Sequence, residues 1–218
     1  MIRRFFTVLL ASLTVSSCVG LAADTLSPQP QGAEVAFVSG IQSDLSSRFA
    51  TIAQAQAAGY FRYTGEDKTG SISYANRQWT SSDPQHPSQL WYSVDGKLLG
   101  ADFSQPYVAG TKPTLWGVNP ERWERFGKHI HWVINVDGKE TYGATSAAKW
   151  TAAGGDADNP QAATVVALGK AKDASQVTHV FVFPAIWDLE VWVLPNSNGA
   201  FAEMNPAVHP SANAQNMD

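Results

Sequence analysis

Cysteine and charge are both scarce in this chain, and each shortage excludes a class of protein. Cys18 is the only cysteine among 218 residues, which excludes internal disulfides, cysteine-ligated zinc and a cysteine nucleophile in the mature domain. Charged residues make up 16% of the chain and hydrophobic ones 44%, so the composition is that of a folded domain and not of a disordered polyelectrolyte. Acidic residues outnumber basic ones by 19 to 15, so we expect no binding to nucleic acid or to an anionic membrane surface.

The first 23 residues have the parts of a bacterial signal peptide. Arg3 and Arg4 supply the positive start. The apolar run over 5–15 has the length of a signal sequence and is too short to cross a membrane. No later apolar run approaches a transmembrane length, so we expect an exported protein.

Two processing routes fit the residues that follow this run. The small residues at 20–22 suit ordinary cleavage near Ala22 or Ala23. The segment VSSC at 15–18 resembles the bacterial lipobox, in which Cys18 is acylated and becomes the first residue. The protein is therefore expected to be periplasmic or an outer-membrane lipoprotein, and a lipid on Cys18 is its only expected attachment to a membrane.

Beyond the signal, residues 24–42 are rich in Pro, Gly, Gln and Ser and predict a flexible tether, with a short strand at Glu34–Val38 as the one element within it. Ser43 suits a helix N-cap, and apolar residues then recur at helical spacing up to Gly59, a glycine of the kind that ends helices. This pattern predicts one amphipathic helix over 43–59.

From residue 71 the hydrophobic period changes to two, which is typical of strands. Asp95-Gly96 and Asp137-Gly138 predict two hairpins with type I′ turns. Residues 144–162 read as a surface loop, and 121–126 as one helical turn. The predicted strands are Ser71–Thr80, Leu90–Val94, Lys97–Phe103, His129–Val136, Glu140–Tyr142, Thr164–Leu168, Val177–Phe183 and Leu189–Leu194.

These elements predict a single α+β domain over 43–206. Its N-terminal amphipathic helix packs on a mainly antiparallel meander sheet, which can curl toward a half-barrel. Residues 207–218 are polar and predict a disordered tail.

Two blocks of residues occur in a fixed order. The first block is ISYAN at 72–76, DPQHP at 83–87, LWY at 90–92 and DGKLLGADF at 95–103; the second is WDLEVWVL at 187–194 and FAEMNP at 201–206. These blocks resemble those of a group of exported bacterial proteins without an assigned function, which carry HYVN…P…RPE-x-L-x-Y…DG-x-L-x-GVEY and then W-x-LHVW-x-W-x-x-NP-x-G-x-F-A-x-x-NP. The resemblance implies one exported domain and no activity to transfer. Ser73 and Glu190 stand where the group has histidines, so a histidine site of the group would be altered here.

His129-Ile130-His131 is the sharpest chemical signal in the chain. On a strand the two imidazoles point to the same face about 7 Å apart, and they can share a divalent metal with a carboxylate from a neighbouring strand. Glu190 is the expected third ligand, because a charge within an apolar strand needs a partner. His179 is a second candidate. The alternative is that the pair faces solvent or packs against tryptophan.

Tryptophan is abundant, with eight in the chain, and several of these rings suit an aromatic cleft for a sugar or another flat ligand. The candidates are Trp91, Trp116, Trp123, Trp132, Trp187 and Trp192, of which Trp132, Trp187 and Trp192 together with Glu190 are the expected ligand-binding set. The alternative for each ring is core packing. Glu190, Asp188 and Glu203 are also weighed as an acid and base pair of the glycosidase kind.

Three functions remain open from the sequence. The first is a non-enzymatic envelope module that binds a small molecule or an envelope protein through an aromatic cleft. The second is a metal-binding protein or metal-dependent enzyme centred on His129 and His131. The third is a purely structural lipoprotein.

Overall fold

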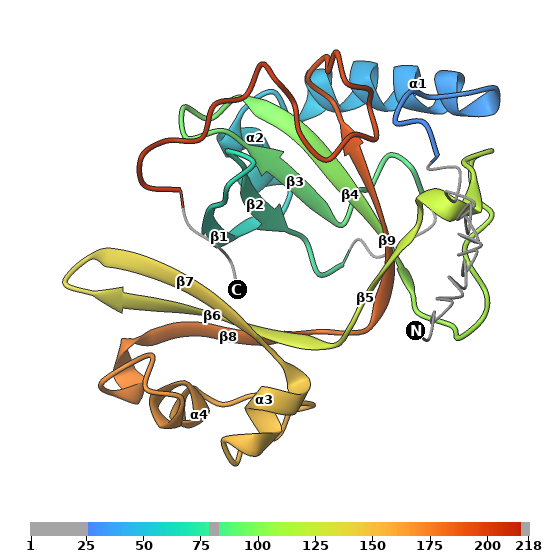
Figure 1. Cartoon of the computed structure of the whole chain (residues 1–218). Coiled ribbons are helices and arrows are strands. Elements are labelled where there is room, and N and C mark those ends of the chain that lie inside the picture. Colours follow the sequence, from blue (N-terminus) through green and yellow to red (C-terminus); the bar gives the residue numbers. More distant parts are fainter. Residues whose placement is uncertain (1–25, 79–82, 215–218) are drawn as a thin grey trace, which may run out of the picture.

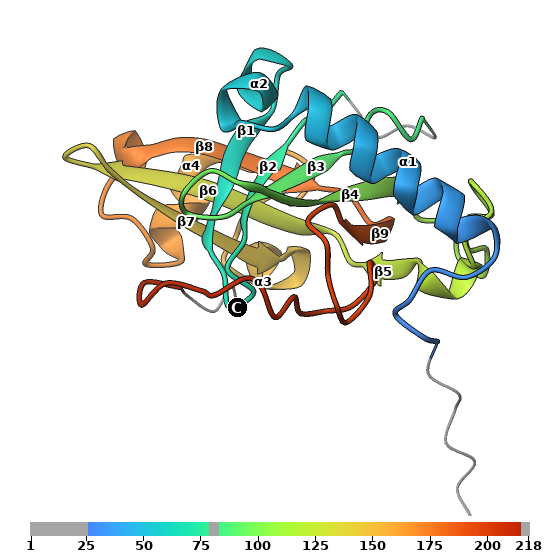
Figure 2. The same ribbon diagram turned by 90° about the horizontal axis from the view of Figure 1, so that it is seen from above.

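The computed structural model describes residues 26–78 and 83–214, which form two antiparallel sheets stacked on each other (Figure 1). Helix α1 (Ala33–Arg48) crosses the outer face of the larger sheet, and α3 (Ala147–Ala152) and α4 (Ala162–Ala167) lie outside the smaller one (Figure 2). The predicted α+β class with mainly antiparallel sheets is confirmed, and neither sheet of the described chain closes into a barrel. The predicted signal peptide over 1–23, with Cys18, lies outside the described residues.

The larger sheet has six strands in the order β1-β2-β3-β4-β9-β5, and every neighbouring pair is antiparallel. Its first four strands form a meander, whereas β9 arrives from near the end of the chain and pairs with β4. The strands are β1 (Phe61–Glu66), β2 (Ile72–Ala75), β3 (Gln89–Tyr92), β4 (Leu98–Pro106), β5 (Glu124–Phe126) and β9 (Ile186–Trp192).

The smaller sheet has the order β7-β6-β8. It consists of β6 (His129–Val136), β7 (Lys139–Ser146) and β8 (Val177–Phe183). The chain passes from β5 directly into β6 and from β8 directly into β9, so the two sheets are joined along one edge (Figure 1). Two short 3-10 helices, η1 (Pro120–Arg122) and η2 (Ala174–Gln176), precede β5 and β8.

Two apolar cores hold these layers together. The main core lies between α1 and the larger sheet, and its fully or nearly buried members include Val38, Ile41, Leu45, Phe49, Leu90, Tyr92, Phe103, Trp123, Leu189 and Val191. The second lies between the smaller sheet and α3 and α4, with Ile130, Trp132, Ile134, Trp150 and Val165. Each such side chain contributes about 1.5–3 kcal/mol on burial, so these two cores fix the helices on the outer faces of the sheets.

The N-terminal helix differs from the prediction at both of its ends. It begins at Ala33 and ends at Arg48, and a separate helix α2 (Ile52–Ala57) follows. Thr51 starts α2 with a capping box to Gln54, which gives the backbone a fresh N-terminus in the middle of the predicted helix. Residues 33–42 are therefore helical and not a tether, and Glu34–Val38 does not form a strand.

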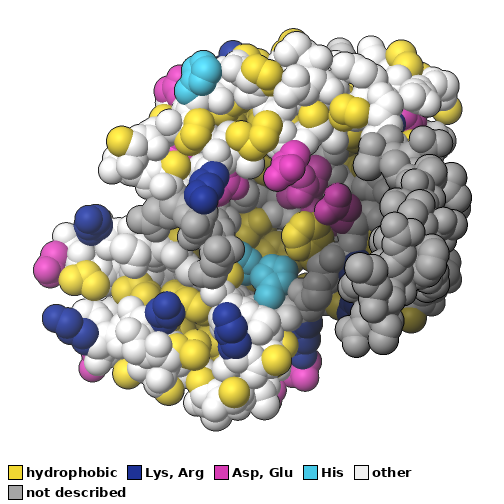
Figure 3. All heavy atoms as spheres, in the orientation of Figure 1, with side chains coloured by type: hydrophobic (Ala, Val, Ile, Leu, Met, Phe, Trp, Pro, Cys, Tyr) yellow, Lys and Arg dark blue, Asp and Glu magenta, His cyan; other side chains and the backbone are white. Residues whose placement is uncertain are grey.

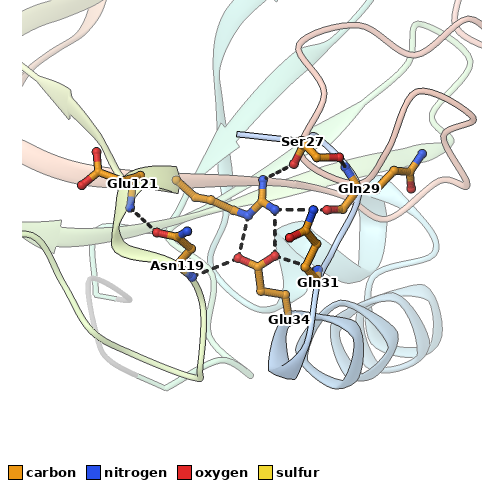
Figure 4. Close-up of polar contacts among 7 residues, drawn as sticks. Ser27, Gln29, Gln31, Glu34, Asn119 and Glu121 are labelled. Carbon is orange, nitrogen blue, oxygen red and sulfur yellow. Dashed lines mark hydrogen bonds and ion pairs between the residues drawn. The ribbon is translucent and has the colours of Figure 1, made fainter. Parts of the chain in front are cut away.

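A buried ion pair explains why the helix begins so early. The Glu34 carboxylate accepts two hydrogen bonds of 2.7 Å from the Arg122 guanidinium, and both side chains are only 4% exposed (Figure 4). The backbone N–H groups of Asn119 and Gln31 donate to the same carboxylate at 2.9 Å. Arg122 also donates to the carbonyl of Ser27. These contacts dock the residues before α1 onto the loop that leads to β5.

The predicted type I′ turn is present at Asp137-Gly138, whereas the turn at Asp95-Gly96 matches that prediction only in part. Asp137 and Gly138 have φ of 54° and 83°, as a type I′ turn requires. At Asp95-Gly96 only Gly96, with φ of 80°, adopts a positive angle, and the register of β3 and β4 shifts beside this turn.

Four further segments differ from their predicted states. The predicted strand Thr164–Leu168 lies mostly in helix α4, and the predicted loop over 144–162 contains the end of β7 and all of α3. Strand β1 was not expected. The tail is ordered as far as residue 214: Val208 is buried, and the Ser211 N–H donates to Glu66 at 2.7 Å.

Candidate functional site

A cavity of about 320 Å³ lies between the facing surfaces of the two sheets. Figure 3 shows acidic side chains and histidines gathered in the hollow between the two layers. The larger sheet lines it with Tyr63, Ser73, Gln89, Trp91, Asp102, Asp188, Glu190 and Trp192, and the smaller sheet with His129, His131, Ala144 and Phe183. None of the residues that line this cavity is Lys or Arg. It therefore joins an acidic wall to an aromatic and imidazole wall.

Three carboxylates converge on the larger sheet because of its strand register. Asp102 on β4 lies directly opposite Glu190 on β9, and Asp188 is two residues before Glu190 on the same face. One carboxylate oxygen from each of the three residues lies within 4.8 Å of the other two. The odd-numbered residues between them, Leu189 and Val191, point the other way into the main core.

Two of these carboxylates are buried and only partly hydrogen-bonded. Asp102 is 5% exposed, and its Oδ2 accepts a 3.0 Å hydrogen bond from the Trp91 indole, but its Oδ1 has no partner. Asp188 is 4% exposed and accepts a 2.7 Å hydrogen bond from the Ser104 hydroxyl. Glu190 is exposed and provides the accessible member of the group.

Burial and mutual repulsion raise the pKa of all three acids. Burial is the main cause for Asp102, whose pKa lies well above its usual range, and the charges of Asp188 and Glu190 add to it. Burial raises the pKa of Asp188 to about 6, with a contribution from Glu124. The pKa of Glu190 rises to about 7, mainly because the cavity walls surround its carboxyl group although part of the side chain still reaches solvent; the charges of Asp188 and Glu124 add to this rise. Without a bound cation, the cluster is therefore partly protonated near neutral pH and keeps a partial negative charge.

The histidine pair forms the opposite wall. The rings of His129 and His131 point to the same side of β6 with centroids 4.9 Å apart. His129 stacks on Phe183 and His131 on Phe181. His131 is 5% exposed and its Nδ1 has no partner. Burial, together with His129, lowers the pKa of His131 to about 3, so its imidazole is neutral.

The three predicted metal ligands His129, His131 and Glu190 line one cavity, but their donor atoms do not lie close enough together to share one ion. Among the described residues, the side chains whose donor atoms lie close enough to share one ion are Asp102, Asp188 and Glu190, and the two imidazoles are not part of this group. His179, the second candidate, lies on the same sheet near Phe61 and does not line the cavity. Glu203 lines the cavity rim outside the converging group.

Of the three tryptophans expected to bind a ligand, only Trp192 lines this cavity. Trp132 points to the other side of β6 and packs beside Trp150 in the second core. Trp187 points to the other side of β9, against Tyr107. The alternation of strand residues separates them from the site. The partner of Trp192 is Trp91, whose ring centroid is 5.6 Å away.

Sequence reasoning missed two residues of the site, Asp102 and Tyr63. Asp102 sits within the apolar run of β4, which is the same signal that singled out Glu190. Tyr63 is in the unexpected strand β1, and its ring lies 4.8 Å from that of His131 while its hydroxyl donates to Gln89. It connects the acidic wall to the histidine wall.

No protein-family model, curated protein or solved structure matches the chain significantly. In the part of the chain that the structure describes, no helix has the length and apolar character needed to cross a membrane.

Proposed function

We propose that this protein is an exported binding module that holds a small uncharged or positively charged ligand in the cavity between its two sheets. The observation that carries the proposal is a pair of buried polar atoms without partners, Asp102 Oδ1 and His131 Nδ1. Both side chains line this one cavity, one from each sheet. A buried polar atom without a hydrogen-bond partner destabilises the protein by about 1–3 kcal/mol. A ligand that reaches both walls can pair with both atoms and relieve this penalty at each of them.

The charge of the cavity selects against anions. Asp102, Asp188 and Glu190 form the floor of the cavity, and two further acids, Asp67 and Glu203, also line it. None of the described residues that line the cavity is basic. An anion would have to enter this negative field as it loses its hydration, whereas a neutral polar molecule or an organic cation would not be repelled.

The walls suit a ligand with a flat or partly apolar body. Trp91, Trp192, Tyr63 and Phe183 present ring surfaces beside the polar atoms, and such surfaces contact sugars and alkylammonium groups favourably. Ser73 and Glu190, the positions where this chain departs from the exported proteins that it resembles, both line the cavity. This placement supports a ligand specific to this chain.

Intrinsic tryptophan fluorescence of the mature protein tests the proposal, because Trp91 and Trp192 lie in the cavity. The titration is made in chelator with D-glucose, D-mannose and D-galactose as neutral probes, putrescine and choline as cations, and D-glucuronate and glutamate as anions. We expect a saturable signal with a neutral or cationic probe and none with the anions.

Two variants and a matched control connect the signal to the cavity. Asp102→Asn replaces a carboxylate oxygen by an amide NH2 group, and His131→Phe removes the unpaired nitrogen. Each should weaken binding by about tenfold or more. Trp187→Phe, which changes a ring on the other face of β9, should leave the affinity unchanged. The proposal fails if no probe binds at about 10 mM, or if binding survives both cavity variants unchanged.

A further inference from the structure

We propose that Asp102, Asp188 and Glu190 form a binding site for a single hard divalent cation, of the class of Ca²⁺, Mg²⁺ or Mn²⁺, on the floor of the cavity. The inference deepens the proposed function, since it concerns the same cavity, but its test requires no organic ligand.

The spacing of the three carboxylates matches one ion. Hard cations bind oxygen at about 2.0–2.6 Å, so two ligand oxygens around one ion are at most about 5 Å apart. The three oxygens here lie within 4.8 Å of one another. The pairing of Asp102 with Glu190 across two strands, with Asp188 two residues along, holds this spacing with the sheet backbone. An ion therefore needs only side-chain adjustment to bind.

A second observation distinguishes this group from an ordinary acidic cluster. Asp102 Oδ1 is buried and has no hydrogen-bond donor, although the other oxygen of the same carboxylate accepts from Trp91. The indole and Ser104 orient Asp102 and Asp188 from outside the group. The Trp91 and Ser104 contacts therefore hold these carboxylates as outer hydrogen-bond partners hold metal ligands, and they leave Asp102 Oδ1 without a competing donor.

The donor set and the surrounding charge indicate which kind of ion binds. All three donors are carboxylate oxygens, which suit Ca²⁺, Mg²⁺ and Mn²⁺ better than the softer ions that prefer imidazole or thiolate. Glu124 and Glu203 border a second hollow that shares Asp188 and Glu190 with the cavity. Arg122, the basic residue of that hollow, is engaged by Glu34. The approach to the site is therefore negative, which favours cations over anions.

Glu190 is exposed, so an ion can reach the site from solvent. The site also leaves coordination positions of the ion open. Three carboxylates supply fewer than the six to eight oxygens that these ions take, so water or a ligand oxygen in the cavity completes the shell. The cavity's second wall, with His131, then faces this open side of the ion.

Isothermal titration calorimetry of the metal-free mature protein tests the site with CaCl₂, MgCl₂ and MnCl₂, and with ZnCl₂ as a comparison that favours histidine. We expect one equivalent of a hard cation to bind with a dissociation constant below about 1 mM and to raise the melting temperature. Asp102→Asn and Glu190→Gln should each weaken binding by about tenfold or more.

A control variant and a test variant locate the ion. Glu140→Gln changes an exposed acid on β7 that lines neither the cavity nor the second hollow, and it should bind the cation as the natural protein does. His131→Phe removes an imidazole of the opposite wall and tests the competing histidine site. Near-ultraviolet circular dichroism confirms that each variant is folded. Binding of Zn²⁺ alone, abolished by His131→Phe and kept by Asp102→Asn, would overturn the site in favour of the histidine pair. So would the absence of binding by every cation tested.

The outcomes also separate this inference from the proposed function. A probe that binds in chelator, to a protein that binds no cation, overturns the cation site alone. A cation that binds, with no organic probe bound in chelator or in saturating cation, overturns the proposed function alone.

Discussion

Asp102 and Asp188 are costly residues for the stability of this protein. Each is buried in the middle of a sheet, and burial raises the pKa of both. A carboxyl that is easier to ionise in the unfolded chain than in the folded one destabilises the fold once the pH exceeds its unfolded pKa. A purely structural role would be served at least as well by asparagine.

We therefore predict that Asp188→Asn stabilises the metal-free protein, with a pH dependence of defined sign. The pKa of Asp188 is about 6 in the fold against an ordinary value of 3.8. The natural protein should lose stability relative to the variant as pH rises from about 4 to about 6, and the difference should stay constant above that range. Urea unfolding in chelator should show a gain of about 1–3 kcal/mol at pH 8 and little gain at pH 3.5. A variant that is less stable at every pH would contradict this.

Glu34 has the opposite effect on stability. Burial alone would raise its pKa, but hydrogen bonds from Arg122, Asn119 and Gln31 outweigh burial and hold the pKa below its usual value. A lowered pKa means that the ionised carboxylate contributes stability above about pH 4.5 and that this contribution is lost as the pH falls through the folded value.

Glu34→Gln should accordingly destabilise the protein by about 3–5 kcal/mol at pH 7, because it leaves the Arg122 guanidinium buried without its counter-charge. The double variant Glu34→Leu with Arg122→Met removes both charges, so it should lower the free energy of unfolding much less than Glu34→Gln does. Urea unfolding of both variants measures this. Equal losses in the two would show that the pair acts through packing and not through charge.

At the scale of elements, the sequence predicts what is local and misses what is set by distant contacts. Both Asp-Gly turns and the shared face of His129 and His131 follow from neighbouring residues, and the structure has them. The start of α1 depends on Arg122, 88 residues away from Glu34, and no local pattern shows it.

Two other errors have the same origin. Val165 and Val166 favour a strand by intrinsic propensity, yet α4 forms because Val165 packs into the second core. The carboxylate group depends on the pairing of β4 with β9, which the sequence does not specify. The predicted strand begins only at Leu189, so its alternation does not cover Trp187, which the structure places within β9 on the face opposite Glu190.

Strand β4 contains a glycine on which the site depends. A Cβ at Gly100 would lie 2.3 Å from Trp91 Cε3 and 2.8 Å from the carbonyl oxygen of Val191. Gly100→Ala should push Trp91 away from Asp102 and cost about 1–3 kcal/mol. Thermal unfolding and tryptophan emission measure both effects. Gly65→Ala in β1, where a Cβ meets no atom within 4 Å, is the matched control and should be nearly neutral.

At the scale of the whole molecule, the described chain is integrated with the fold almost from its first residue. Arg122 donates hydrogen bonds to the carbonyls of Ser27 and Gln29. A lipid on Cys18 would therefore be separated from the folded domain by a short stretch of residues only.

Mass spectrometry of the mature protein, purified from the envelope of a bacterial host, tests the processing. We predict a mature N-terminus that precedes Ser27, either at an acylated Cys18 or directly after Ala22 or Ala23. Acyl mass on Cys18 selects the lipoprotein route, and an unmodified chain that begins after Ala22 or Ala23 selects the soluble one. Retention of residues 1–17 would contradict the prediction of export.

The way the two sheets are joined has a consequence for the order of folding. The smaller sheet and its helices form one continuous stretch, inserted between β5 and β9, which are neighbours in the larger sheet. This insert has its own core and a short-range β6–β7 hairpin, so we expect it to fold early and to bring the flanking strands together. The pairing of β4 with β9 would then close a shorter effective loop, and we expect the carboxylate group to assemble late as the chain reaches its native state.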